Sequence, residues 1–399
     1  MTMTRSQIAL LAGFSALAPM AIDMYLPALA PLASDLSVSV ERAGQSISIF
    51  LIGLAGGQLV TGPLSDRLGR RPVFLTGLLL FCIGAIFAAL TQDFMVLLVA
   101  RLLQAFGACS AMVTGRAIVR DRMEVNEAAR FFSLLALIGG LAPVLAPLLG
   151  AMLIQFGDWR LIFWVMSGFA ALLLLTGMLV MPESRSTQTA IKARGEHPFA
   201  AYRSLLGNPA LLGYLLAAMC NSAAFFSYVA NSSVLFVDGY GLTPTQFSLV
   251  FGVNSLALVG TAQINRVMLT RRNAMQLLRL SARNAAILAA LLLAFALVQP
   301  EGKLGFWLFA GLLFLMVGSI TPVQANSMAG GLAIEPLRAG STAALFGACT
   351  FAGGAVASWL AGLLYDGTAR GLSFVVALCL IGVSAAIYLI VLRSVPQTA

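Results

Sequence analysis

An aspartate, Asp23, lies inside the first long apolar run of the chain, within the stretch Pro19-Met-Ala-Ile-Asp-Met-Tyr-Leu-Pro27. A carboxyl group among lipid tails or packed helices is costly to keep charged unless a partner or water is near. Pro27 has no amide hydrogen to donate to the carbonyl of Asp23, which predicts a loosened helix around the acid. We therefore interpret Asp23 as a carboxyl group that exchanges protons in a moving part of the protein. The alternative is a carboxylate held in a static ion pair.

An arginine, Arg101, is the second charge deep inside an apolar run, and Gln104 follows one helical turn later. At 1.5 Å rise per residue, Asp23 and Arg101 would both lie roughly 10 Å below the outer boundary of the membrane. A buried guanidinium also needs a counter-charge or water. We therefore expect Asp23 and Arg101 to be coupled, either directly or through Gln104 or water.

A third group of charges lies between the second and third apolar runs, in Gly62-Pro-Leu-Ser-Asp66-Arg-Leu-Gly69-Arg70-Arg71. The glycines favour a tight turn, and the arginines around Asp66 can hold its carboxylate. A role of these arginines in topology alone is the alternative, although topology requires neither the acid nor the glycines.

The fifth apolar run contains Ala142-Pro143-Val-Leu-Ala146-Pro147-Leu-Leu-Gly150. Two Ala-Pro steps four residues apart place kinks and small residues on one face, which permits close helix contact. A kinked helix with a packing role alone is the alternative.

The second half of the chain has no acid inside an apolar run, but it has interleaved amides and aromatic rings. Such side chains are typical of a partly apolar ligand cavity, and they equally serve to bond one helix to another. With Tyr25 from the first half, the candidate cavity residues are Asn221, Phe225, Tyr228, Asn231, Asn254, Gln324 and Asn326.

The composition indicates a polytopic membrane protein, because 60% of the residues are hydrophobic and only 10% are charged. A water-soluble domain has roughly a quarter charged residues. The five cysteines all lie in apolar runs without a CxxC pair, so neither disulfides nor a zinc site is expected. The single histidine, His197, lies in a polar linker. A metal or catalytic site based on histidine is therefore excluded.

Twelve apolar runs reach the length of about 20 residues that a membrane-spanning helix needs. The first contains Asp23 and is longer than a signal-peptide core, so we interpret it as a retained span. Thr243-Pro-Thr-Gln246 predicts a capped start for the eighth span. The predicted spans are 7–30, 41–63, 73–91, 94–119, 129–154, 160–181, 208–237, 246–268, 276–298, 304–328, 340–364 and 371–393.

The distribution of Lys and Arg predicts that both termini are cytoplasmic. The loops on the opposite side contain only Arg42, Arg160, Lys303 and Arg370, and the other basic residues except Arg101 fall on the terminal side. This asymmetry follows the positive-inside rule. It also accounts for the net charge of +9, so no nucleic-acid partner is expected.

The longest polar stretch divides the chain into two weakly similar halves of six spans. We predict an all-α membrane protein of two pseudo-symmetric six-helix bundles, 1–181 and 208–399, joined by a cytoplasmic linker, 182–207. Arg70-Arg71 and Arg271-Arg272 follow corresponding spans in the two halves. Two related halves are typical of transporters that move about a central site.

The loop from Gly62 to Arg71 resembles the G-x-L-x-D-R-x-G-R-R signature of the major facilitator superfamily. The resemblance implies that Asp66 takes part in a cytoplasmic latch facing the start of the eleventh helix at Ser341, with Asp121 as a second acid. Arg101-Leu-Leu-Gln104 resembles the R-x-x-Q-G-x-G motif of the family, which is implicated in proton coupling. Ala105 replaces its first glycine.

The Ala-Pro repeat around Pro143, Pro147 and Gly150 is similar to the G-P-x-x-G-G motif of the antiporters in this superfamily, with alanines in place of two glycines. Together with Asp23-Met-Tyr-Leu-Pro27, it resembles the Bcr/CflA drug-resistance subfamily. The resemblance implies proton-coupled efflux of small lipophilic drugs, such as phenicol- or bicyclomycin-type antibiotics, across the bacterial inner membrane by alternating access. We expect a monomer in the lipid bilayer whose partners are drug and protons, with no cofactor beyond the proton gradient.

Three other functions remain open from the residues alone. A proton-coupled exporter or importer of an endogenous metabolite would need the same acid. An intramembrane enzyme would need paired acids or a Ser/His group inside the spans, and the runs contain neither. A channel would need repeated polar residues along a pore.

Overall fold

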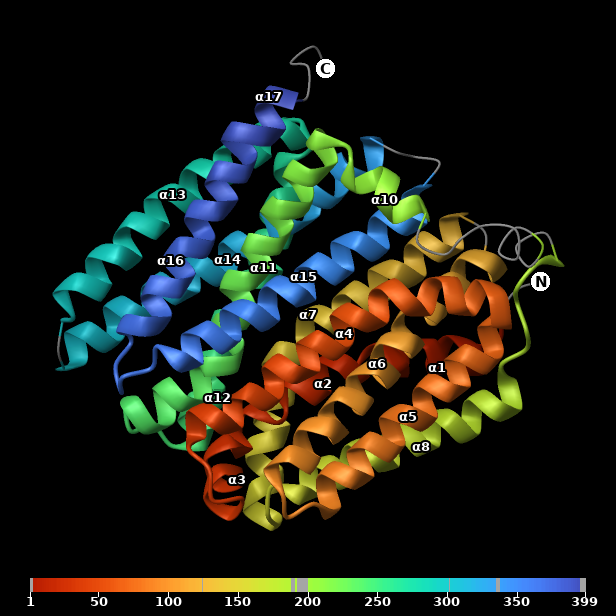
Figure 1. The fold of residues 1–399 in the computed structure, drawn as a ribbon, viewed down its shortest axis with the longest axis horizontal. Coiled ribbons are helices and arrows are strands. Elements are labelled where there is room, and N and C mark those ends of the chain that lie inside the picture. The colour runs from red at the N-terminus through yellow and green to blue at the C-terminus, as the bar shows by residue number, and fades with distance from the viewer. Residues whose placement is uncertain are drawn as a thin grey trace. The chain divides into compact units, whose positions relative to one another are not determined.

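The computed structural model describes residues 3–123, 125–187, 191, 200–300, 302–334 and 338–394, and these residues form helices joined by short turns (Figure 1). No strand occurs among them. A helix satisfies its backbone hydrogen bonds within one segment, which is what a chain in hydrocarbon requires. The predicted all-α membrane fold is confirmed.

The chain divides into two compact units. Unit 1 comprises Met1–Ser39 and Ile49–Ala200, and unit 2 comprises Val40–Ser48 and Ala201–Ala399. The boundary near residue 200 falls within the predicted linker, and the first residues of one long helix, Val40–Ser48, group with unit 2. The main helices of unit 1 are α1 (Arg5–Ser15), α2 (Leu17–Asp23), α3 (Leu29–Asp35), α4 (Val40–Leu68), α5 (Arg70–Leu90), α6 (Phe94–Arg122), α7 (Val125–Phe156) and α8 (Arg160–Val180).

Unit 2 begins near a short helix and contains six long helical segments, two of which end in a π-helical turn. The helices are α10 (Ala200–Leu206), α11 (Pro209–Ser233) with η2 (Val234–Gly239), α12 (Pro244–Met268), α13 (Ala274–Val298), α14 (Gly302–Ile334), α15 (Ala339–Leu363), α16 (Arg370–Ala385) with η4 (Ala386–Val391), and α17 (Leu392–Ser394).

Eleven helical segments of the described chain are long and apolar enough to cross a membrane. They match the predicted spans to within a few residues at most ends. The fifth predicted span corresponds to α7, whose described apolar part is Val144–Phe156. The predicted cap of the eighth span is confirmed, because the Thr243 hydroxyl accepts from the Gln246 amide and the Gln246 side chain accepts from the Thr243 amide.

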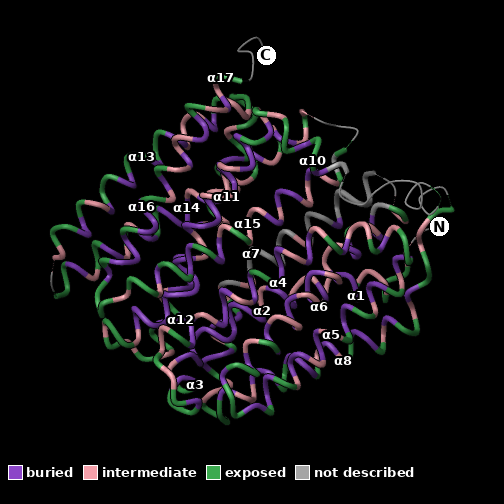
Figure 2. The backbone as a smooth tube through the Cα atoms, viewed as in Figure 1, coloured by how far each residue is buried: buried purple, intermediate pink, exposed green. Residues whose placement is uncertain are grey.

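Exposed apolar side chains mark the surface that faces lipid. Exposed residues follow one side of α13 and of α8 (Figure 2). Leu179 on α8 is 86% exposed and Leu297 on α13 is 79% exposed. A water-soluble protein would bury most such leucines, so their exposure fits helices that border hydrocarbon.

A cluster around Arg160 holds the last part of the first span. The Arg160 guanidinium lies 2.8 Å from the Asp35 carboxylate and donates to the Thr91 carbonyl over 3.0 Å. The indole nitrogen of buried Trp159 also donates to Asp35 over 3.2 Å. These contacts join the end of α3 to the end of α5 and the start of α8, so the last segment of the first span is anchored.

Candidate functional site

Asp23 is the last residue of α2, at a break in the first span. The chain passes from α2 through a 3-10 turn, η1 (Leu26–Ala28), into α3. The Ala28 amide donates to the Tyr25 carbonyl over 3.0 Å instead of continuing an α-helical pattern. The missing amide hydrogen of Pro27 accounts for the interruption. The predicted loosening of the helix around Asp23 is confirmed.

Arg101 on α6 occupies the carbonyl end of this broken helix. Its guanidinium donates to the Ala21 carbonyl over 2.8 Å and to Gln104 Oε1 over 2.7 Å. The Ala21 carbonyl belongs to the last turn of α2, where the carbonyls lack helical partners. A cation at the C-terminal end of a helix is stabilised by the helix dipole. The carbonyl of Ala21, in the last turn of α2 before the break, is therefore one of the acceptors that hold Arg101.

Three aromatic rings surround the Arg101 guanidinium. Its central carbon lies 4.4 Å from the ring centre of Phe50, 4.9 Å from that of Tyr25 and 5.8 Å from that of Phe163. The rings come from α4, the first span and α8, and Arg101 and Tyr25 are both 0% exposed. The electron-rich faces of aromatic rings attract a cation. The rings, with the Ala21 carbonyl and Gln104, explain how the cation is held without a carboxylate.

A direct ion pair between Asp23 and Arg101 is not formed within the described part of the chain. Arg101 contacts the backbone of Ala21, two residues before Asp23. Side chains two residues apart on a helix point roughly 200° apart, so the side chains of Ala21 and Asp23 point in nearly opposite directions. Asp23 is 6% exposed, so its carboxyl group is buried. Arg101 Nε is also buried and has no hydrogen-bond partner among the described residues. Coupling through Gln104 or water stays a prediction.

The Ala-Pro helix, α7, packs against the first span at this same break. Gly150 is buried, and a Cβ atom there would overlap the carbonyl oxygen of Met24, the residue after Asp23. Pro147 and Ala146 are buried beside it, while the side chain of Pro143 lies outside the described part. The predicted close helix contact is present, and it occurs next to the acid.

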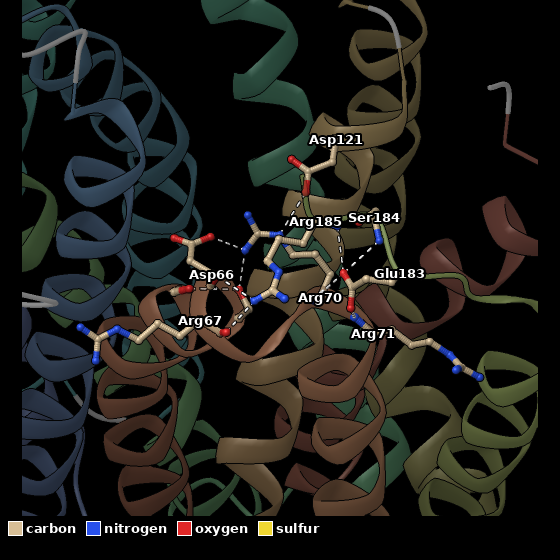
Figure 3. A network of polar contacts seen from close by, with 10 residues as sticks. Asp66, Arg67, Arg70, Arg71, Asp121, Glu183, Ser184 and Arg185 are labelled. Atoms are coloured by element: carbon tan, nitrogen blue, oxygen red, sulfur yellow. Dashed lines mark hydrogen bonds and ion pairs between the residues drawn. The ribbon is translucent and has the colours of Figure 1, made fainter. Parts of the chain in front are cut away.

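The charges around Gly62–Arg71 form a second site at the other end of unit 1 (Figure 3). Arg70 is 1% exposed and makes ion pairs with Asp66 and with Asp121, the latter at 3.0 Å. Its guanidinium also donates to the Ser65 hydroxyl over 2.6 Å. One arginine therefore links the end of α4, the start of α5 and the end of α6. The predicted grouping of Asp66, Arg70 and Asp121 is confirmed.

Glu183, which the sequence reasoning missed, completes this network. Its carboxylate accepts from the backbone amides of Arg70, Arg71, Ser184 and Arg185 at 2.9 to 3.2 Å. Partial burial opposes ionisation, but the four amide donors prevail and lower the pKa of Glu183. The carboxylate thus caps the start of α5, where helix amides are unpaired and the dipole favours an anion. An acid directly after the sixth predicted span, among arginines that the sequence predicts to be cytoplasmic, is the signal that could have revealed it.

Glycine is required at the turn that presents these amides. Gly69 has a φ of 117°, a conformation that side chains disfavour, and a Cβ atom there would press on the Glu183 carboxylate. The Arg71 side chain donates to the Met178 carbonyl over 2.9 Å. A Cβ atom at Gly62 would have no atom within 4 Å, so this glycine makes no close contact that a side chain would disturb. The approach of Asp66 to Ser341 would join the two units and stays a prediction.

Most of the candidate cavity residues of unit 2 bond helices to one another. Asn221 donates to the Ile320 carbonyl over 3.0 Å, Asn254 donates to the Tyr228 hydroxyl over 3.0 Å, and Asn326 donates to Asn265 over 2.9 Å. The remaining candidates behave similarly or are partly exposed: Asn231 donates to the Ser227 and Ser358 carbonyls, Gln324 bonds Ser222 and Thr350, and Phe225 is half-buried. Contact of these residues with a ligand stays a prediction.

Comparison with known sequences gives matches along nearly the whole chain. The sequence profile described as Major Facilitator Superfamily matches residues 11–358. The MFS-type transporter YdgK of Bacillus subtilis, which is uncharacterised, is 33% identical over 90% of this chain and 89% of its own length. The bicyclomycin resistance protein homolog of Haemophilus influenzae is 28% identical over 95% of this chain and 94% of its own length. Multidrug resistance protein MdtL of Escherichia coli is 30% identical over 59% of this chain and 60% of its own length.

Comparison with solved structures agrees on the fold. A D-xylose-proton symporter superposes with a TM-score of 0.76 at 15% identity, over 98% of both chains. A bacterial homolog of the lysosomal transporter Spinster superposes with a TM-score of 0.71 at 12% identity, also over 98% of both chains. At these identities the likeness concerns the fold alone.

Proposed function

Because the chain belongs to the major facilitator superfamily and is a multi-pass membrane transporter, we propose that it exports small lipophilic drugs in exchange for protons. The observation that carries the proposal is the position of Asp23. It is a buried carboxyl group at a helix break, beside an arginine that already has other partners. A carboxyl group without a permanent partner is free to change its protonation state during a cycle.

The proposed cycle uses the two states of one carboxyl group. The neighbouring cation favours the ionised form of Asp23, whereas removal of water favours the neutral form. Water entering from outside delivers a proton to Asp23, and the protonated protein changes to the inward-facing state. Arriving drug, or a low proton concentration in the cytosol, then releases that proton inward, and the drug leaves in the opposite direction.

The membrane potential supplies the driving force in this proposal. Each positive charge that moves inward through 100 mV contributes about 2.3 kcal/mol. A neutral drug exchanged for one proton could be concentrated roughly fiftyfold outside by the potential alone, since 1.4 kcal/mol corresponds to a factor of about ten.

The proposed drug class rests on relatives. The printed names of two of them refer to bicyclomycin resistance and to multidrug resistance. We extend that class to this chain as phenicol- or bicyclomycin-type compounds. The resemblance of the Ala-Pro repeat in α7 to the motif of the superfamily's antiporters supports export rather than import, by analogy.

The test is a drug-susceptibility panel in an efflux-deficient bacterium. Cells that express the chain should tolerate at least one lipophilic antibiotic at a higher concentration than cells with an empty vector. The Asp23→Asn variant, present in the membrane at equal abundance by immunoblot, should remove that tolerance. Unchanged susceptibility across the panel, with protein in the membrane, would contradict drug export.

A further inference from the structure

A groove lies between α12 and α13 of unit 2, and we call it the α12–α13 groove. It encloses about 580 Å³, with α12 and α13 as its walls and α14 as its floor. Each wall is fastened to the floor. Asn326 of α14 donates to Asn265 of α12 over 2.9 Å, and Phe295 of α13 stacks on Phe309 of α14 with ring centres 5.3 Å apart. The groove is therefore held open by the packing of both walls on α14.

The α12–α13 groove faces lipid and has an uncharged lining. Ile264 on α12 and Ile287 on α13 line it and are exposed, as residues that border hydrocarbon are. No Asp, Glu, Lys or Arg occurs among the described residues that line it. An ion in such a place would lack both water and a counter-charge, which is costly. The lining therefore selects against a charged occupant.

Polar groups without partners also line the groove. Asn265 is 7% exposed, and while its Oδ1 accepts from Asn326, its Nδ2 has no hydrogen-bond partner in the part of the chain that the structure describes. On the opposite wall, Ser281 and Asn284 have no hydrogen-bond partner among the described residues. Unpaired polar groups at membrane depth are costly. These three side chains therefore favour an occupant that can form hydrogen bonds with them.

The floor of the groove contains a proline inside a helix. Pro322 of α14 has no amide hydrogen, so the carbonyl of Gly318 cannot accept the usual helical hydrogen bond from residue 322. Both residues line the groove. A carbonyl without its helical partner thus lies at the floor, where it adds an acceptor to the polar side chains of the walls.

Apolar side chains flank these polar groups in both directions along the groove. Asn284 lies roughly 15 Å along α13 from its first residue, near the middle of the helix, and Gly318 lies in the middle of α14. The lining contains Leu277 and Leu280 toward the start of α13 and Leu291 in the other direction. An acyl chain alone would leave the central polar groups unpaired. The order apolar, polar, apolar fits an occupant that has its own polar groups in the middle.

We infer that the α12–α13 groove binds an uncharged lipophilic molecule from the bilayer whose hydroxyl or amide groups lie between apolar ends. The volume suits a drug-sized ligand, since such pockets measure roughly 300 to 1,000 Å³. Gly260 leaves room on the α12 wall, because a Cβ atom there would have no atom within 4 Å. Phenicols have the required arrangement, with two hydroxyls and an amide between an aromatic ring and a chlorinated carbon. The groove belongs to unit 2 alone, whereas Asp23 belongs to unit 1, so this binding site is additional to the proposed exchange site.

The test is photolabelling of the whole purified protein in lipid nanodiscs with a chloramphenicol analogue that has an azide in place of the nitro group. Peptide mass spectrometry should place label on residues 277–291 of α13 or on the facing residues of α12, and excess chloramphenicol should remove it. Asn284→Leu removes one hydrogen-bonding group and should lower the apparent affinity of this labelling about fivefold. Thr76→Leu makes a polar-to-apolar change at an exposed position of α5 and should leave the affinity unchanged.

Space in the groove is tested by Gly260→Leu, which should lower the affinity at least about tenfold. Gly168→Leu makes the same change at an exposed, uncrowded site of α8 and should have no effect. Label confined to other helices, or unchanged labelling in Gly260→Leu, would overturn the inference. Labelling of the groove by a photoreactive hydrocarbon that chloramphenicol cannot displace would also overturn it, since an acyl chain would then be the favoured occupant.

The choice of a phenicol as the probe rests on the proposed function, but photolabelling is read without transport. The two proposals can therefore fail separately. Labelled α13 in a protein that gives no antibiotic tolerance would support the groove and contradict export. Export of chloramphenicol by a protein whose groove is never labelled would contradict the groove alone.

Discussion

At the scale of single residues, Arg101 is held by geometry as well as by charge. Its planar guanidinium reaches Gln104 and the Ala21 carbonyl with two different nitrogens and presents its faces to three rings. Lysine carries the same charge but has neither the flat fork nor the stacking face. A lysine at this position would therefore keep the positive charge and lose the contacts that depend on the shape of arginine.

Arg101→Lys should lower proton-driven drug transport by at least about tenfold, because two charge-assisted hydrogen bonds of about 1.5 to 3 kcal/mol each cannot both be kept. Arg101→Gln, which removes the charge, should be at least as impaired. The measurement is initial drug efflux from loaded cells, normalised to the amount of protein in the membrane. Full activity in Arg101→Lys would show that a point charge suffices and that the fork is dispensable.

At the scale of helices, the break in the first span organises the site around it. Pro27 ends α2, the end of α2 gives Arg101 an acceptor at Ala21, and Gly150 of α7 packs on the backbone at Met24. The last segment of the span, α3, is meanwhile anchored by Arg160. The first span is thus fixed beyond the acid and interrupted at it. A change of helix direction at this break would move the carboxyl group of Asp23.

Gly150→Ala should weaken this contact, because the added methyl group would overlap the Met24 carbonyl oxygen. Overpacking of a tight interface typically costs 1 to about 3 kcal/mol. We expect a lower midpoint of thermal unfolding in detergent and reduced drug efflux. Gly168→Ala on α8, where a methyl group meets no atom within 4 Å, is the matched control and should behave as the unaltered protein. Equal stability of the two variants would contradict the close approach of α7.

The Glu183→Gln substitution should reduce the stability of the protein at neutral pH, and this reduction should become smaller in acid. Folding lowers the pKa of Glu183. The ionised carboxylate therefore stabilises the fold at every pH above the ordinary glutamate pKa, about 4.3. This contribution disappears as the pH falls through the lowered pKa of the folded protein. For an exposed cap we expect a cost of about 1 kcal/mol at pH 7. Thermal unfolding of both proteins at pH 7 and at pH 3.5 checks this. A stability difference that does not narrow in acid would contradict the cap.

The spans and the break at Pro27 could be predicted from the sequence because apolar length and a missing amide hydrogen are local properties. The cap at Thr243 was equally local. Glu183 was missed because its partners, the amides of Arg70 and Arg71, are far away in sequence and meet it only after α5 and α8 pack. Gln104, one turn along the same helix, could be predicted as a neighbour of Arg101, but the aromatic rings and the Ala21 carbonyl that also hold the cation come from other helices and could not.

At the scale of the whole molecule, the proposal that Asp23 carries the exchanged proton implies one proton for each cycle. Asp23 is a buried carboxyl group at the break in the first span, and the amides of unit 2 mostly serve to join helices. The network around Arg70 fastens the opposite end of unit 1 without reaching the acid. In the proposed mechanism, Asp23 would exchange the proton and the network around Arg70 would act as a latch, as rigid-body alternation requires.

The stoichiometry should therefore be one proton for each drug molecule. Reversal potentials in proteoliposomes, measured while the pH gradient is opposed by a known drug gradient, give this ratio directly. A ratio of two would require a second titrating group and would contradict a mechanism that depends on Asp23 alone.

The most direct test of the central claim compares two transport modes of Asp23→Asn in proteoliposomes. The account predicts that this variant loses uphill drug transport and drug-induced proton movement, yet still exchanges labelled for unlabelled drug when no gradient is applied. Proton-driven accumulation of drug at the rate of the unaltered protein would contradict the account.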